Sequence, residues 1–83
     1  MKDLTLVELG EMMEKARKDA RVRFGKVVSR EIVAEKIGTD PHSIYKWEKG
    51  VQHPGFLNVV KFCDFLGITL DDLLGVKKNG CYA

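Results

Sequence analysis

Apolar residues recur at intervals of three and four along most of the chain, the spacing that places them on one face of an α-helix. In the first segment these positions are Leu6, Leu9, Met13, Ala16 and Ala20. Just before them, Thr5 and Glu8 form a capping box, in which each side chain accepts a hydrogen bond from the other residue's backbone N–H. The pattern predicts a helix from about Leu6 to about Arg23, ended by Gly25.

The second helix is expected to be short and to end in a tight turn. Ser29 can cap it, and Gly38 can end it because glycine accepts the left-handed backbone that closes many helices. Three residues face inward: Ile32, Val33 and Ile37. Residues 38–40 alone separate it from the next helix. So short a connection forces the two helices to cross steeply, which predicts a helix-turn-helix.

The third helix has well-marked limits in the sequence. Asp40 is expected to cap it, and Pro41 takes the first helical position, where a missing N–H loses no hydrogen bond. Ile44 and Trp47 are three residues apart and share the inward face. Gly50 closes the helix.

Two more helices complete the predicted fold. The fourth starts near Gly55, with an apolar stripe formed by Phe56, Val59, Phe62, Cys63 and Leu66. Thr69 caps a short fifth helix. No segment alternates with a period of two, so the predicted fold class is all-α, a compact five-helix domain over residues 1–75. Residues 76–83 show no period and are expected to form a flexible tail.

Length and composition fit one small folded domain. The chain has 83 residues, 45% of them hydrophobic and 31% charged, which suits a small core better than a roomy enzyme cleft. No apolar run approaches a membrane span, and the N-terminus lacks the apolar region of a secretory signal. Cys63 and Cys81 are expected to be free thiols, which favours a cytoplasmic location. We expect no cofactor and no metal, because the two histidines have no partner at ligand spacing, and we interpret the protein as a non-enzyme.

Charge is distributed unevenly along the chain. The formal net charge is +2, yet residues 15–30 contain seven Lys or Arg residues and only one acidic residue, Asp19. The rest of the chain is therefore net acidic. A face that binds an anion explains this asymmetry, and so does an ordinary solvated helix face.

The stretch SREIVAEKIGTDPHSIYKWEKG, residues 29–50, resembles the lambda-repressor-like helix-turn-helix family of phage repressors and bacterial regulators. The resemblance covers about residues 9–75, including LGEMMEKAR near the start and LGITLDDLLG at the end. The matching residues, which are specific as an ordered set, are Ala34, Gly38, Ile44, Trp47, Glu48, Gly50 and Pro54. The resemblance implies that Glu48 pairs with Arg17. Together with the buried Ile44 and Trp47, this pair would fix the rotation of the third helix.

The resemblance also implies that the third helix enters the major groove of double-stranded DNA and reads base edges. The base-reading residues would be Pro41, His42, Tyr45 and Lys46. Lys46 can donate to guanine, His42 can donate or accept, and Pro41 offers only apolar contact. The expected phosphate contacts are Arg30, Thr39, Ser43, Lys49, Gln52 and His53, together with the backbone N–H groups at the start of the fourth helix.

Two features depart from the family pattern. The family usually has Gln where this chain has Arg30. The link from Arg17 to Ser29 is also longer than usual, so the segment KDARVRFGKVV either extends the first helix or forms a basic loop. We expect three of its residues to pack against the core: Phe24, Val27 and Val28. Three others are expected to lie along the DNA backbone: Arg21, Arg23 and Lys26.

These observations favour a sequence-specific transcriptional regulator, a repressor that binds a pseudo-palindromic operator as a homodimer. Four apolar residues exceed what a small core buries and form either secondary core or a twofold interface through the fourth and fifth helices: Leu57, Val60, Phe65 and Leu70. Two alternatives stay open. One is a protein-interaction module of the same fold, such as an antitoxin or a scaffold. The other is the N-terminal domain of a longer ligand-sensing regulator.

Overall fold

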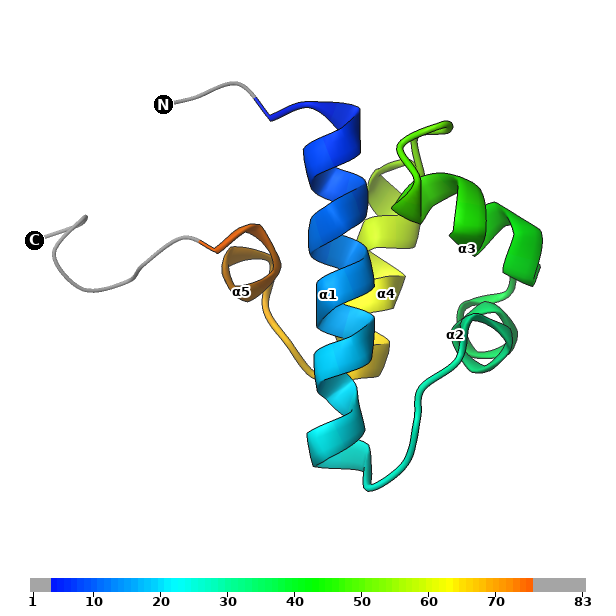
Figure 1. Ribbon diagram of the computed structural model, residues 1–83, viewed down its shortest axis with the longest axis vertical. Coiled ribbons are helices and arrows are strands. Elements are labelled where there is room, and N and C mark those ends of the chain that lie inside the picture. Colours follow the sequence, from blue (N-terminus) through cyan, green and yellow to red (C-terminus); the bar gives the residue numbers. More distant parts are fainter. Residues whose placement is uncertain (1–3, 76–83) are drawn as a thin grey trace, which may run out of the picture.

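The helices expected from the sequence are present in the computed structural model, which describes residues 4–75. They are α1 (Leu6–Phe24), α2 (Arg30–Ile37), α3 (Pro41–Glu48), α4 (Phe56–Leu66) and α5 (Leu70–Leu74) (Figure 1). No strand occurs within residues 4–75, and the predicted all-α fold class is confirmed. The expected tail at 76–83, with Cys81, lies outside the described residues.

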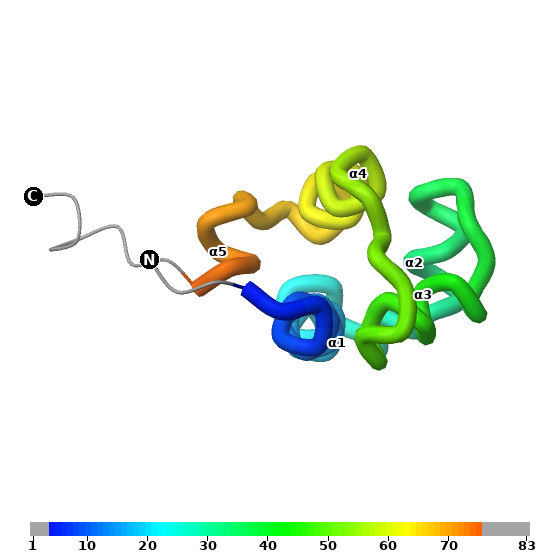
Figure 2. Tube along the Cα trace, turned by 90° about the horizontal axis from the view of Figure 1, so that it is seen from above, coloured from blue at the N-terminus to red at the C-terminus, as the bar shows by residue number. Residues whose placement is uncertain are grey.

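Helix α1 is the centre of the arrangement. It packs against α3, α4 and α5, whereas α2 packs against α3 and α4. Figure 2 shows α5 on one side of α1 and the α2–α3 pair on the other. As a result α3 has one side against the core and the other side at the molecular surface.

Side-chain caps start three helices as predicted. The hydroxyls of Thr5, Ser29 and Thr69 each accept a hydrogen bond from the backbone N–H three residues later. At the end of α2, Gly38 has a φ of 83°, and the N–H groups of Gly38 and Thr39 both donate to the carbonyl of Ala34. This paired closure turns the chain sharply into α3 and produces the predicted helix-turn-helix.

The core takes side chains from all five helices. The largest fully buried side chains are Met13, Val28, Val33, Ile44, Phe62 and Leu66. In α4 the predicted stripe is buried from Val59 onward, but the prediction for Phe56 is wrong, since that side chain is 72% exposed. Phe56 occupies the first position of α4, at the edge of the stripe. Burial raises the pKa of the Cys63 thiol, which keeps it protonated and unreactive.

The long link between the first two helices is largely an extension of α1, which continues to Phe24. The Phe24 ring packs edge-on against Phe65 of α4, with ring centroids 5.5 Å apart, so Phe65 belongs to the core region. Val28 is buried, but the expectation that Val27 packs inward is wrong, because it is 65% exposed. Both valines lie in the segment without regular structure between α1 and α2, where only Val28 is turned toward the core.

Candidate nucleic-acid interface

The outer face of α3 carries the residues expected to read DNA. Ile44 and Trp47 are buried on its inner side. Their burial turns Pro41, His42 and Tyr45 to the exposed side, and Lys46 is partly exposed beside them. Ala34, four residues before Gly38, is buried where α2 packs against α3.

The start of α3 differs in one detail from the expected cap. Asp40 occupies the N-cap position, but its side chain makes no capping bond to the backbone. Instead the Ser43 hydroxyl donates to the Asp40 carboxylate at 2.6 Å, and this bond lowers the pKa of Asp40. Ser43 was expected to contact a phosphate, and the structure gives its hydroxyl a protein partner.

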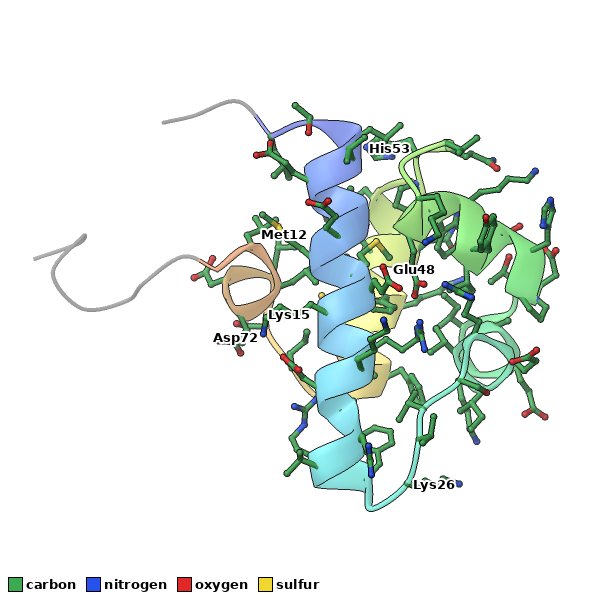
Figure 3. The ribbon with its side chains drawn as sticks, viewed as in Figure 1. Met12, Lys15, Lys26, Glu48, His53 and Asp72 are labelled. Atoms are coloured by element: carbon green, nitrogen blue, oxygen red, sulfur yellow. The ribbon has the colours of Figure 1, made fainter. Side chains whose placement is uncertain are left out.

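A buried carboxylate at the end of α3 holds three elements together. Glu48 is 3% exposed, and its Oε2 accepts from Arg17 Nε at 2.6 Å. Its Oε1 accepts from Arg17 Nη2 at 3.2 Å and from Arg30 Nε at 2.8 Å. Arg17 also donates to the carbonyl of Val28 at 3.0 Å. The structure thus brings α1, α2 and α3 together at Glu48, which lies between α1 and α3 in Figure 3.

A glycine that the sequence analysis did not single out allows α1 and α3 to approach closely. Gly10 lies within α1, and a Cβ atom placed there would overlap the backbone carbonyl oxygens of Trp47 and Glu48. An isolated glycine inside a helical pattern is the signal that marks such a position, because glycine otherwise weakens a helix.

Arg30, expected at a phosphate, lies between the buried anchor and the exposed face of α3. Beyond its bond to Glu48, its Cζ atom is 5.1 Å from the centre of the Tyr45 ring. Lys49 Nζ approaches the same ring at 5.7 Å, and the His42 ring stacks nearly parallel to it, with centroids 6.3 Å apart. Arg30, His42 and Tyr45 border a shallow hollow that is also lined by Val27, Ser29 and Pro41.

The other expected phosphate residues fall into two places. Thr39 lies in the turn before α3, while Lys49, Gln52 and His53 are exposed between α3 and α4. His53 accepts from the N–H of Gly55, the N-cap of α4, at 2.8 Å. Gly55 supplies no side-chain cap, so the first N–H groups of α4 are open to an outside acceptor.

The basic residues of the long link do not all share one side of the molecule. Arg21 and Lys26 are exposed, and Lys26 projects from the loop after α1 (Figure 3). Arg23 is turned toward α4, where its Nη2 donates to the carbonyl of Leu66 at 2.8 Å. The structure therefore does not bring Arg23 together with the residues of α3.

Part of the positive charge of this segment is locally paired. Lys15 Nζ is 2.8 Å from Asp19 Oδ2, and Lys18 Nζ is 3.2 Å from Glu14 Oε2. The hydrogen bond from Lys18 lowers the pKa of Glu14. Lys15, Lys18 and Asp19 are exposed and Glu14 is only partly buried, so both pairs contribute little to stability.

Within residues 4–75, no group of three His, Cys, Asp or Glu side chains is placed to hold a metal ion. None of the helices there combines the length and the apolar character needed to cross a membrane.

Comparison with known proteins agrees with this geometry. A family model described as helix-turn-helix matches residues 28–73, which is more than half of the chain and spans α2, α3, α4 and most of α5. Neither a curated protein nor a solved structure matches the sequence. The matched range begins at the link before α2 and contains the turn of Gly38, the exposed face of α3 and Glu48. The chain therefore belongs to the lambda-repressor-like family of helix-turn-helix DNA-binding proteins.

Proposed function

We propose that the protein is a sequence-specific regulator of transcription that binds double-stranded DNA through the outer face of α3. The observation that supports this most strongly is the two-sidedness of α3. Ile44 and Trp47 are buried on one side, whereas His42 and Tyr45 are exposed on the other. An α-helix fits the major groove, and residues near its N-terminus reach the base edges.

The chemistry of the exposed side chains suits base recognition. Lys46 can donate to O6 and N7 of guanine, and His42 can donate or accept. Phosphates would be held by Arg30 at the start of α2, by the loop from Lys49 to His53, and by the free N–H groups of α4. Because such contacts release counterions, affinity is expected to fall steeply as salt concentration rises.

Replacing Lys46 by alanine is expected to weaken binding to the preferred DNA sequence by about 1–3 kcal/mol and to relax one base position. Electrophoretic shift assays on the preferred duplex and its single-base variants measure both effects. Lys36→Ala, which removes an exposed lysine of α2, is the control and should keep the same base preference.

A loss that is equal for all sequences would mean that Lys46 contacts a phosphate, and its base-reading role would be wrong. Failure of the unaltered protein to shift any duplex, whether random or genomic, would reject the proposed function. The fold would then be more consistent with the protein-interaction alternative.

We further propose that the protein acts as a homodimer in the cytoplasm and represses by occupying a pseudo-palindromic operator. Phe56, Leu57 and Val60 form an exposed apolar surface on α4, here called the α4 patch. Lys61 and Asp64 are exposed beside it. A surface with an apolar centre and one charge of each sign at its edge can pair with itself around a twofold axis. The half-sites would lie about one helical turn apart.

The α4 patch is small, so the free dimer is expected to be weak. Its three side chains offer roughly a few hundred Å² per copy, below the ~800 Å² per partner of a standard interface. Leu57, which is 70% exposed, is replaceable without disturbing the core. We expect Leu57→Glu to abolish dimers that the unaltered protein forms at high concentration, as measured by sedimentation equilibrium.

Val22→Glu is the matched control, because Val22 is an exposed apolar residue of α1, outside both α4 and α5. It should leave the association constant unchanged. An unaltered protein that stays monomeric both alone and on a two-half-site duplex would contradict the homodimer, and the α4 patch would then serve a different protein partner.

A further inference from the structure

We propose that Arg30 is a positioning residue that sets base specificity, because it connects the buried carboxylate of Glu48 to Tyr45 and His42 on the reading face of α3. This inference rests on the proposed function. It gives Arg30 a role in addition to the phosphate contact expected for it. It concerns the residue that departs from the family's usual Gln.

One end of the connection is rigid. Glu48 has a fully buried side chain, which Arg17 holds through both carboxylate oxygens. Arg30 Nε donates to this fixed carboxylate at 2.8 Å, and Arg30 Nη2 lies 3.8 Å from Glu14. One hydrogen bond and one ion pair therefore hold the planar guanidinium, so the position of Arg30 depends on Glu48 and Glu14.

The other end reaches the surface. The Arg30 guanidinium lies 5.1 Å from the centre of the Tyr45 ring, a distance at which a cation is attracted to an aromatic face. Lys49 adds a second cation 5.7 Å from the ring, and His42 stacks on Tyr45 at 6.3 Å with 10° between the planes. These contacts hold the Tyr45 ring in place. Because Tyr45 is 43% exposed, the ring is still accessible to a ligand.

Arg30 therefore influences the orientation of the side chains proposed to read bases. His42, Tyr45 and Lys49 are spaced by three and four residues and form one stripe along α3. Without Arg30 the Tyr45 ring can turn toward α2, and His42 loses the fixed ring on which it stacks. Gln at this position could still donate to Glu48, but it offers no cation to the ring. Arg30 therefore affects base preference through Tyr45 and His42.

Selection of bound oligonucleotides tests this role. We expect Arg30→Gln and Tyr45→Leu to weaken the preference at the same base position, each by roughly three- to tenfold, and the double variant to be no worse than either single one. Arg30→Lys should recover part of the preference because it keeps a cation. The charge-matched control is Lys36→Gln, on the same helix, which should leave the preference unchanged. If Arg30→Gln lowers affinity equally for all sequences, Arg30 is only a phosphate contact and the inference is overturned.

A measurement on the free protein separates this inference from the proposed function. In NMR spectra, Arg30→Gln should shift the ring-proton resonances of Tyr45 and His42, whereas Lys36→Gln should not. Unchanged ring resonances would show that Arg30 does not hold Tyr45, and they overturn the inference even if DNA binding is intact. If the resonances shift but the unaltered protein selects no sequence, the contact exists and the proposed function is what fails.

Discussion

Replacing Glu48 by alanine is expected to destabilise the folded domain by about 3–5 kcal/mol, because it leaves buried arginine without its partner. Arg17 is 7% exposed, and Glu48 is its charged partner. Within residues 4–75 every buried side-chain nitrogen and oxygen has a hydrogen-bond partner, so removing this carboxylate breaks a satisfied network. A small domain is stable by only about 5–15 kcal/mol, and this loss takes much of that margin. Urea unfolding followed by circular dichroism measures it.

Two comparisons identify the cause of this loss. Glu35→Ala removes an exposed glutamate of α2 and should change stability by no more than about 0.5 kcal/mol. Adding Arg17→Met to Glu48→Ala should restore part of the lost stability, since the unpaired buried charge is then gone. A Glu48→Ala protein as stable as the unaltered one would show that the three arginine–glutamate bonds do not hold these helices together.

Gly10→Ala has the second largest expected effect, a destabilisation of about 3 kcal/mol, near the upper end for overpacking a tight contact. The added methyl group would collide with the backbone carbonyls of Trp47 and Glu48, which cannot move aside as a flexible side chain does. Helix propensity alone favours alanine over glycine by about 1 kcal/mol, so the sign of the change decides between the two effects. Thermal unfolding of the purified variant is the measurement.

The control for this variant is Glu11→Ala, which changes the neighbouring exposed position of α1. It should change stability by no more than about 0.5 kcal/mol. If Gly10→Ala raises the melting temperature, α1 and α3 are farther apart than the structure places them. The α1–α3 contact that positions the exposed face of α3 would then be wrong.

The sequence is sufficient to locate the helices because their boundaries depend on nearby residues. Thr5, Ser29 and Thr69 accept bonds from groups only three residues away, and Gly38 closes α2 against Ala34. The inward side of α3 is equally local, since Ile44 and Trp47 share one face of one helix. These features depend only on residues close in the sequence, so they can be predicted without knowledge of tertiary contacts.

Features that depend on how distant segments meet could not be read from the pattern. Arg30 and Glu48 are 18 residues apart, and their contact depends on the crossing of α2 and α3. Arg23 is one of several basic residues in the sequence, but its position on α1 turns it to the end of α4. Phe56 fits the apolar spacing of α4, yet it stays exposed in the first turn.

Stability and the proposed recognition of DNA depend on the same residues. Glu48 anchors α3 to α1 through Arg17, and the same carboxylate fixes Arg30 beside Tyr45. A change at Glu48 is therefore expected to alter both folding and base preference. A change at Lys46 is expected to alter base preference alone, because Lys46 is not part of this network.

We expect the exposed side of α3 to dock onto a DNA duplex. The most direct test is an NMR titration of the protein with a duplex obtained by selection, in which the shift of every backbone amide is followed. The largest shifts are expected at His42, Tyr45 and Lys46, with smaller ones at residues 49–56 and at the start of α2. Shifts centred on α5 or on the α4 patch, with α3 unchanged, would show that α3 is not the DNA-binding surface.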